Sequence, residues 1–328
     1  MKRIVSGLTA TGNLTLGNYL GSIKNLVKAQ DEYEVFMFVA DLHAITLPIE
    51  ADVLRSNVRK QLATYMACGI DVNKTKLFKQ SEIKGHTELF YLLTTISNEG
   101  QLKRMTQYKD KSVKNANKTE NIPLGLLMYP VLMAADIIIY NADGVIVGAD
   151  QKQHLELTRD LVDRMNSRFN LDFKYPEPII AKEGAKIMAL KTPTKKMSKS
   201  DTDADETIYL LDNIEVARKK IMSSLTDSEN KVKYDIENKP GVSNLIAIYA
   251  AVNDIAISEA EDKLKDMDYK VFKETVADSV CELLKDIQDK YNSISDDNIR
   301  TRLDKNIETI QNEASISLEK IMKGYGIK

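Results

Sequence analysis

Hydrophobic and polar positions divide the 328-residue chain into two parts with different periodicity. In the first part, short apolar runs alternate with segments that carry apolar residues at helical spacing. Such runs are typical of strands covered on both faces of a parallel sheet, and the spacing is typical of amphipathic helices. We predict an α/β fold with a doubly wound parallel sheet, in which ligands bind at the carboxyl ends of the strands. The predicted strands are 3–5, 35–40, 76–80, 145–147 and 179–180, and the predicted helices are 18–29, 55–67, 86–96, 124–140 and 150–169.

The second part of the chain carries helical periodicity alone. Extended apolar runs vanish after residue 205, and the pattern predicts helices at 214–224, 241–252, 258–264, 271–291 and 296–325. We therefore expect a first domain over 1–204 and an α-helical domain over 205–328, whose last helix could return to the first domain. A polar, basic stretch at about 100–122 interrupts the first domain and is interpreted as a connecting segment rather than a core element.

Composition and charge exclude several classes of protein. Hydrophobic residues make up 43% of the chain and charged residues 29%, which is typical of a globular protein and not of a disordered one. A net charge of -2 argues against a uniformly basic surface but leaves room for a local nucleic-acid patch. No apolar run reaches about 18 residues, so we expect no membrane span. Cys68 and Cys281 lie in helical patterns and are expected to be buried, and a reduced, cytoplasmic protein is the default.

Candidate chemistry begins between the first predicted strand and the first predicted helix. Residues 6–21 contain glycines at positions 7, 12, 17 and 21, which let the backbone approach a ligand closely. The N-terminus of a helix also offers unpaired N–H groups that suit phosphate. The stretch matches neither the G-x-G-x-x-G nor the G-x-x-x-x-G-K-[ST] pattern, so a simple strand-to-helix turn is the alternative interpretation.

A second candidate stretch is Lys-Lys-Met-Ser-Lys-Ser-Asp at 195–201. Its cations alternate with hydroxyl groups in a loop that follows Thr-Pro-Thr at 192–194. It could be a solvated turn. Two loops suited to polyphosphate on one α/β chain, however, favour a nucleotide site.

Two acidic residues are candidates for ligand contacts. Asp136 interrupts a strongly apolar helix, and an unpaired buried carboxylate is costly. It therefore lies either on an exposed edge or against a ligand that offers a hydrogen-bond donor. Asp150 follows Gly148 where a strand ends and a helix begins, so it either faces a ligand or caps the helix, which contributes about 1 kcal/mol.

Taken in order, these motifs resemble the class I aminoacyl-tRNA synthetases and, more narrowly, the bacterial-type tryptophanyl-tRNA synthetases. Thr-Leu-Gly-Asn at 15–18 stands where the class usually has His-Ile-Gly-His, and Lys-Met-Ser-Lys-Ser is intact at 196–200. Further blocks of resemblance lie at 39–46, 104–112, 125–136 and 147–160, so the resemblance covers nearly the whole chain.

The resemblance implies a Rossmann-like catalytic domain, an anticodon-binding helical domain and a cytoplasmic homodimer. Tryptophan is activated with ATP to tryptophanyl-adenylate and pyrophosphate, and is then transferred to the 2′-hydroxyl of the terminal adenosine of tRNA(Trp). Magnesium enters with ATP, and neither a protein-bound metal nor a membrane is implied. Neither step needs an enzyme nucleophile, so positioning and charge stabilisation carry the chemistry.

The resemblance also assigns site residues in three groups. Catalytic roles fall to Lys196, Lys199, Ser198, Ser200, Lys111 and Asn18. The ATP-binding group consists of Thr9, Ala10, Thr11, Gly17, Asn18, Gly148, Ala149, Asp150, Ile187, Lys196, Met197, Ser198, Lys199 and Ser200. The tryptophan-binding group consists of Asp136, Tyr129, Met133, His43, Val145, Val147 and Gln151, in which Asp136 accepts the indole N–H.

The chain departs from the family pattern at three places. Relatives commonly read Gln-Pro-[Ser/Thr] where this chain has Thr-Ala-Thr at 9–11, which removes a side-chain contact near the substrate ammonium group. Ala149 stands where a glutamate is frequent, and Asp-Thr at 201–202 replaces Asp-Pro. None of these removes a residue that the chemistry needs.

Three other functions compete with this interpretation. A tyrosyl-tRNA synthetase has the same architecture and a similar lysine loop. A catalytically inactive synthetase-like RNA-binding protein would keep the fold without adenylate formation. A nucleotidylyltransferase shares the first motif and the sheet but has no such long helical domain. The Met-Ala-Ala-Asp block at 133–136 and the Asp-Gln-Lys-Gln-His run at 150–154 favour tryptophan.

Overall fold

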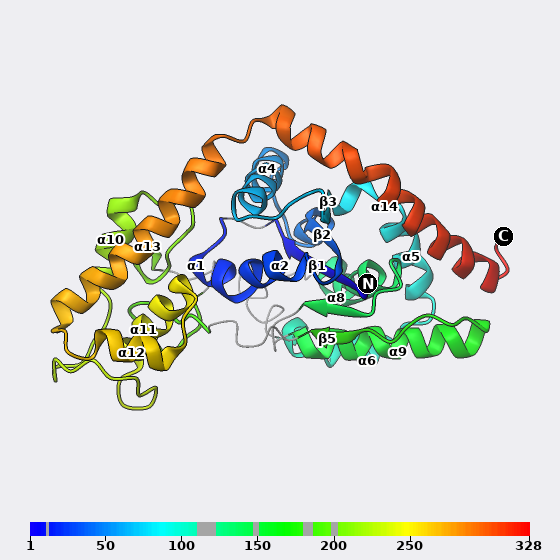
Figure 1. The fold of residues 1–328 in the computed structure, drawn as a ribbon. Helices are drawn as coiled ribbons and strands as arrows, with labels where there is room; N and C mark the ends of the chain where they lie inside the picture. Colours follow the sequence, from blue (N-terminus) through cyan, green and yellow to red (C-terminus); the bar gives the residue numbers. More distant parts are fainter. Residues whose placement is uncertain (11–12, 110–122, 147–150, 180–185, 198–202) are drawn as a thin grey trace.

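A parallel sheet of five strands forms the centre of the computed structural model, which describes all residues except 11–12, 110–122, 147–150, 180–185 and 198–202 (Figure 1). The strand order is β3-β2-β1-β4-β5, with every neighbouring pair parallel. This order confirms the predicted doubly wound sheet. The strands are β1 Arg3–Thr9, β2 Glu34–Ala40, β3 Thr75–Lys79, β4 Gly144–Ile146 and β5 Glu177–Ile179.

The middle strand β1 is longer than the predicted strand 3–5. It continues through Thr9 because residues 6–9 pair with residues 37–40 of β2, so that Thr9 lies opposite Ala40. The glycine-rich stretch therefore begins inside the sheet, and only its second half forms the turn.

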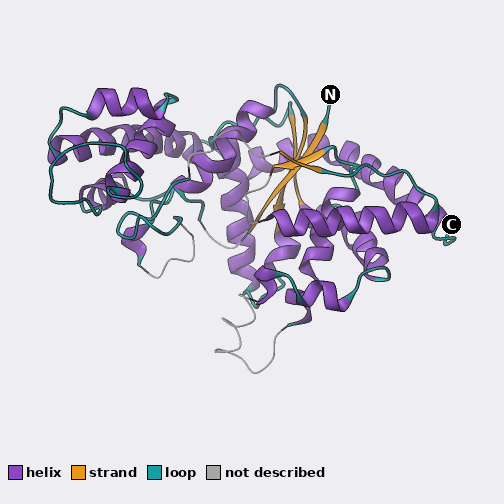
Figure 2. Ribbon diagram, turned by 90° about the horizontal axis from the view of Figure 1, so that it is seen from below, coloured by secondary structure: helices purple, strands orange, loops and turns teal. Residues whose placement is uncertain are grey.

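Helices cover both faces of this sheet (Figure 2). One face carries α1 Leu16–Asn18, the π-helical turn η1 Tyr19–Ile23, α2 Lys24–Ala29 and α4 Ala51–Ala67. The other face carries α5 Gly85–Thr94, α8 Leu124–Ile138 and α9 Lys152–Phe169. Shorter turns follow the strands, namely α3 Asp41–Ala44 after β2 and η2 Gln80–Glu82 after β3. The two faces bury separate hydrophobic clusters.

The first helix begins at Leu16, two residues before the predicted start. Thr15 caps it: the Asn18 N–H donates to Thr15 Oγ1 at 3.1 Å, and the Thr15 N–H donates to Asn18 Oδ1 at 3.0 Å. This reciprocal capping box satisfies two backbone donors and fixes the helix start within the Thr-Leu-Gly-Asn motif.

The basic segment at about 100–122 is not wholly a connection. Its first part forms α6 Glu99–Lys103, and Leu102 and Met105 are 2% and 3% exposed within the core of the α8 face. The interpretation as a non-core segment is therefore wrong for this part, because two apolar residues among the lysines anchor it. Residues 110–122 lie outside the description.

The five helices predicted after residue 205 all occur, each within two residues of the predicted ends. They are α10 Ile214–Met222, α11 Pro240–Asn253, α12 Ile257–Leu264, α13 Tyr269–Asn292 and α14 Asp296–Gly324, and a 3-10 turn, η4 Ala204–Glu206, precedes them. α14 lies along the part of the molecule that contains the sheet (Figure 1), and its Ile310, Ala314 and Ile321 join the core of the α8 face. No single helix among the described residues has the length and composition to cross a membrane, although α11 and α12, bent by 111°, pass that test together.

Candidate active site

Asp136 lies on α8 facing the carboxyl ends of β2 and β3, and its side chain is 2% exposed. Three groups donate hydrogen bonds to its carboxylate. His43 Nε2 lies 2.8 Å from Oδ2, while Gln80 Nε2 and His86 Nδ1 lie 2.7 and 2.6 Å from Oδ1. The alternative that placed Asp136 on an exposed edge is therefore wrong, because the helix turns this position inward.

The three donors come from different elements that converge at this edge of the sheet. His43 belongs to α3, directly after β2; Gln80 follows β3; and His86 is the second residue of α5. Sequence analysis named His43 but missed Gln80 and His86. Gln80 could have been predicted from the sequence, because polar residues at the carboxyl ends of parallel strands gather at one edge of the sheet.

Hydrogen bonding keeps Asp136 ionised. Burial alone acts to raise the pKa of this carboxyl, but the hydrogen bonds from His43 and His86 outweigh it and hold the pKa below its usual value. A carboxylate accepts about four hydrogen bonds. The described residues occupy two sites on Oδ1 and one on Oδ2. Among the described residues, no second donor reaches Oδ2, which leaves one of its acceptor sites without a described partner.

Other members of the predicted tryptophan group surround Asp136. Tyr129 and Met133 lie on the same helix, seven and three residues before it, and so share its face. The Tyr129 hydroxyl lies 2.8 Å from His154 Nε2, and its ring meets His43 edge-on at 6.3 Å between centroids.

Two further members of this group lie in β4 and at the start of α9. Val145 is 3% exposed and pairs with Val5 in the sheet. Gln151 is half-buried at the start of α9.

The middle strand carries an exposed glycine next to the Phe38 ring. Gly7 is exposed although Val5 and Ser6 before it in β1 are buried. A Cβ atom at position 7 would lie 2.5 Å from Cε2 of the Phe38 ring, too close for any side chain without a shift. The Phe38 ring therefore fills the space that a side chain at position 7 would need, and glycine is the residue that fits beside it.

The two signature motifs meet beside the first helix. A Cβ atom placed on Gly17 would lie 3.6 Å from Met197 Cβ and 3.7 Å from Ile187 Cβ. Backbone hydrogen bonds pair the second motif with the segment before it, from Met197 N to Ile187 O at 3.0 Å and from Ala189 N to Lys195 O at 2.8 Å. The structure thus brings Gly17, Ile187 and Met197 of the predicted ATP group together.

Segments 187–190 and 195–197 thus form a short hairpin, and the helical region after residue 205 contacts it through hydrogen bonds. Asn244 of α11 donates from Nδ2 to Met188 O at 2.9 Å and accepts from Met188 N at 2.8 Å. Segment 208–210 also pairs with the first motif, since Leu16 N donates to Ile208 O at 2.8 Å. Sequence analysis missed Asn244, because nothing in a helical pattern marks one asparagine as a partner of a distant loop.

The remaining predicted residues occupy varied positions. Thr9 ends β1, Ala10 is buried, Asn18 uses its side-chain oxygen in the capping box, and Lys196 is exposed. The structure therefore places these four at or next to the first strand-to-helix turn and the hairpin. Those that lie outside the described residues are Thr11, Lys111, Val147, Gly148, Ala149, Asp150, Ser198, Lys199 and Ser200.

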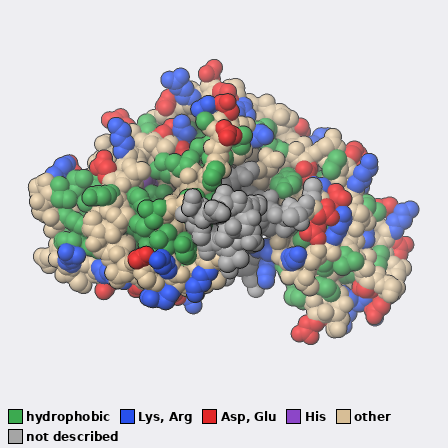
Figure 3. Space-filling model, turned by 180° about the vertical axis from the view of Figure 1, so that it is seen from behind, with side chains coloured by type: hydrophobic (Ala, Val, Ile, Leu, Met, Phe, Trp, Pro, Cys, Tyr) green, Lys and Arg blue, Asp and Glu red, His purple; other side chains and the backbone are tan. Residues whose placement is uncertain are grey.

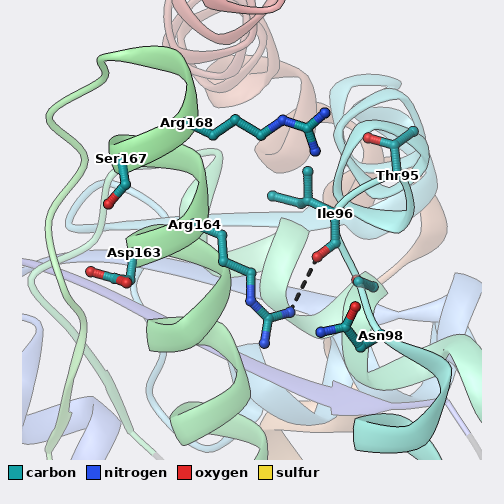
Figure 4. A pocket seen from close by; sticks show the side chains of 8 residues that line it. Thr95, Ile96, Asn98, Asp163, Arg164, Ser167 and Arg168 are labelled. Carbon is teal, nitrogen blue, oxygen red and sulfur yellow. Dashed lines mark hydrogen bonds between the residues drawn. The ribbon is translucent and has the colours of Figure 1, made fainter.

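A cleft of about 480 Å³ lies elsewhere, between the end of α5 and α9 (Figure 4). Arg164 and Arg168 line it, and Arg164 donates to Ile96 O at 3.2 Å. None of the predicted site residues faces this cleft, so we place the candidate site at Asp136 and the hairpin, where the chemistry converges. In the described part of the chain, no cluster of three or more His, Cys, Asp or Glu side chains could hold a metal ion.

Comparison with known proteins defines the class. The model of the family described as tRNA synthetases class I (W and Y) matches residues 1–311. Because the match covers most of the chain, this chain belongs to that family, and it is an aminoacyl-tRNA ligase.

Three similar members of this family are tryptophan enzymes. The tryptophan–tRNA ligase of Malacoplasma penetrans is 51% identical over 309 residues, which is 93% of this chain and 92% of that protein. The tryptophanyl-tRNA synthetase of Mycoplasma pneumoniae superimposes with a TM-score of 0.91 and 39% identity over 100% of this chain and 98% of that one. That of Campylobacter jejuni, in complex with ADP and tryptophan, has a TM-score of 0.83 and 30% identity and covers 99% of each chain.

Proposed function

We infer that this chain is a tryptophan–tRNA ligase rather than a tyrosine enzyme or an inactive RNA-binding relative. The tryptophan carboxylate attacks the α-phosphate of MgATP, releases pyrophosphate and forms tryptophanyl-adenylate. The 2′-hydroxyl of the terminal adenosine of tRNA(Trp) then takes the tryptophanyl group. The observation that carries this proposal is the buried Asp136 carboxylate with one acceptor site left, within a family that activates tryptophan or tyrosine.

We propose that Asp136 accepts the indole N–H at the remaining site on Oδ2. The hydrogen bond to His43 fixes that oxygen, Met133 supplies apolar surface on the same helix face, and Tyr129 would receive the polar end of the amino acid. A site built to bond a substrate N–H rejects an analogue that lacks it by roughly 10⁴–10⁵-fold, because its buried acceptor is left unpaired. Phenylalanine offers no such donor. His43 and Asp136 thereby select the substrate before any bond is made.

ATP would bind at the second cluster, where the two signature motifs meet. The Gly17 backbone lies beside Ile187 and Met197, which suit the adenine and ribose, and the helix start at Leu16 suits phosphate. Lys196 is exposed next to this cluster and would stabilise charge on the leaving pyrophosphate. Lys199, Ser198, Ser200 and Lys111 would act with it, and magnesium would arrive as part of the MgATP substrate.

Two larger surfaces extend the proposal beyond the small substrates. The helical region from α10 onward would read the anticodon of tRNA(Trp). A second copy of the chain would cover exposed apolar surface of the catalytic part, since Tyr91 on α5 and Leu124 on α8 are 68% and 70% exposed. Apolar side chains gather on the face of the molecule seen from behind (Figure 3). Light scattering at micromolar concentration tests for the homodimer, and a monomer mass would refute it.

ATP–pyrophosphate exchange with each of the twenty amino acids tests the proposed reaction. We expect exchange with tryptophan alone, and we expect Asp136→Ala to lose or relax it. Asp143→Ala is a matched control, because Asp143 accepts from Arg3 N at 2.8 Å at the amino ends of the strands, away from the site. Exchange with tyrosine would move the protein to the sister enzyme. Exchange with no amino acid would overturn the proposal in favour of a binding protein.

A further inference from the structure

A buried chain of hydrogen bonds extends behind Asp136, away from the proposed substrate. His86 Nδ1 lies 2.6 Å from Asp136 Oδ1, and His86 Nε2 lies 2.8 Å from the hydroxyl of Tyr140. His86 and Tyr140 are both 0% exposed, and Asp136 is 2% exposed. The proposed function uses the carboxylate but assigns no role to the two residues behind it.

The close packing of α5 against α8 brings the members of this hydrogen-bonded chain together. Asp136 lies in the last turn of α8, and Tyr140 lies in the turn that directly follows the end of this helix at Ile138. His86 comes from the start of α5, directly after Gly85, the first residue of this helix. A Cβ atom on Gly85 would lie 2.6 Å from Ile139 Cδ1, so glycine lets α5 approach α8 closely enough for His86 to reach both partners.

Aromatic packing holds the far end of the chain in place. The Tyr140 ring stacks on Phe36 with 4.4 Å between centroids and meets Phe78 edge-on at 5.9 Å. These contacts fix the position of the ring independently of its hydroxyl. A Tyr140→Phe variant would therefore keep the packing and remove only the hydrogen bond.

The direction of each hydrogen bond follows from the ionised carboxylate. Asp136 only accepts, so the Nδ1–H of His86 donates to it. In the neutral ring Nε2 is then an acceptor, and the Tyr140 hydroxyl donates to it. Burial, followed by the nearby Asp136 charge, raises the pKa of Tyr140 well above its usual value, so this hydroxyl keeps its proton. The Asp136 carboxylate thus fixes the Nδ1–H tautomer of His86, the Tyr140 hydroxyl supports that tautomer from the other ring nitrogen, and His86 orients Asp136.

Gln80 occupies the second acceptor site of Asp136 Oδ1. Its Nε2 donates to Asp136 Oδ1, while its Oε1 has no hydrogen-bond partner among the described residues although Gln80 is 0% exposed. Reversing the amide would turn Oε1 toward the carboxylate, so this orientation is the favourable one. With both sites of Oδ1 occupied by protein donors, a ligand N–H has access to Oδ2 alone.

We propose that His86 and Tyr140 are positioning residues that hold the Asp136 carboxylate in one orientation, and that they thereby set the preference for a substrate bearing an N–H donor. This inference rests on the proposed function. Neither residue touches the substrate; each acts through Asp136. His86 and Tyr140 contribute to the selectivity between substrates. This effect is distinct from a contribution to the stability of the fold.

Two substrates that differ in one atom separate these roles. Tryptophan and β-(3-benzothienyl)alanine have nearly the same shape, but sulfur replaces the indole N–H in the second. The quantity to measure is the ratio of their kcat/KM values in ATP–pyrophosphate exchange. The hydrogen bond to a charged acceptor sets a lower limit of roughly tenfold on the wild-type ratio, and the buried carboxylate left unpaired raises it toward the 10⁴–10⁵-fold given above. A purely structural defect lowers both values together and leaves the ratio unchanged.

The variants are His86→Leu, His86→Asn and Tyr140→Phe. We expect His86→Leu to reduce the ratio to about one to threefold, because Asp136 loses its orienting donor. His86→Asn should recover most of it, since the asparagine amide N–H lies where Nδ1–H was. Tyr140→Phe should give an intermediate ratio. The KM for ATP should stay within about twofold of wild type in each variant, which also shows that the protein is folded.

A buried tyrosine on the opposite face of the sheet provides the control. Tyr65 is 0% exposed, and its hydroxyl accepts from Gln61 Nε2 at 2.6 Å. Tyr65→Phe removes a buried hydrogen bond of the same kind and should leave the ratio unchanged.

The outcomes distinguish the two levels of the argument. A wild-type ratio near one would refute the role of Asp136 itself. A large wild-type ratio that survives intact in Tyr140→Phe and in His86→Leu would overturn the positioning role while leaving the proposed function standing. If His86→Leu does not fold, the Tyr140→Phe and His86→Asn ratios decide the matter.

Discussion

Replacing Gly17 by alanine tests whether this glycine is needed for folding or for ligand binding. The Cβ atom of an alanine would meet Thr15 Oγ1 at 3.5 Å, Met197 Cβ at 3.6 Å and Ile187 Cβ at 3.7 Å. All three are ordinary van der Waals distances, so the folded chain has room for the methyl group. Gly17 lies in the first turn of α1, where alanine is favoured over glycine by about 0.5–1 kcal/mol. We therefore expect Gly17→Ala to melt at the wild-type temperature or roughly 1–3 °C above it.

The same methyl group should impair catalysis. It projects into the space between the two signature motifs, where we propose that ATP approaches the backbone. A displacement of about 1 Å between reacting groups can cost roughly 100-fold in rate. We expect kcat/KM for ATP in pyrophosphate exchange to fall by about that factor, with the tryptophan KM changed less. A stable variant with wild-type kinetics would refute the placement of ATP at Gly17, and a strongly destabilised one would refute the packing argument.

Three further predictions test the surrounding framework. Asn244→Ala should raise the KM for ATP roughly tenfold and lower stability by about 1–3 kcal/mol, measured by exchange and urea titration, because both backbone groups of Met188 lose their partner. Gly241→Ala should destabilise the protein by roughly 3 kcal/mol or more in a urea titration, because its Cβ atom would lie 2.0 Å from the carbonyl oxygen of Leu225. Iodoacetamide at pH 8 should leave Cys68 unlabelled until the protein unfolds, as mapped by mass spectrometry, because burial raises its pKa to about 12.

The helices and the parallel sheet were predictable because each has a period that one sequence displays. The helices after residue 205 are amphipathic or begin with a strong signal such as Pro240, and their ends agree within two residues. β1 was underestimated because residues 6–9 contain a serine, a glycine and a threonine, and their strand conformation depends on pairing with β2. Tertiary pairing of this kind leaves no local pattern.

The site was predictable where its residues belong to a motif. Gly17 and Met197 lie in the two signatures, and Asp136 was conspicuous as a single acid in an apolar helix. His86 and Asn244 were not found. Each lies in a helix where its spacing is unremarkable, and each acquires a partner only when α5 meets α8 or α11 meets the hairpin. A partner brought in by packing has no signal in the spacing of one chain.

The arrangement at Asp136 also explains why a charged acceptor can lie in so apolar a place. An isolated buried carboxylate would take up a proton, and it would then donate where the indole N–H needs an acceptor. Donors from His43, Gln80 and His86 prevent this, and they also occupy its acceptor sites until a single one on Oδ2 remains. The three donors that stabilise the charge therefore also define the direction from which a ligand N–H can approach the carboxylate. On the proposed function, a substrate completes the set only when it brings an N–H along that direction. Phenylalanine leaves the site unpaired, and a tyrosine hydroxyl must reach it from the end of a smaller ring.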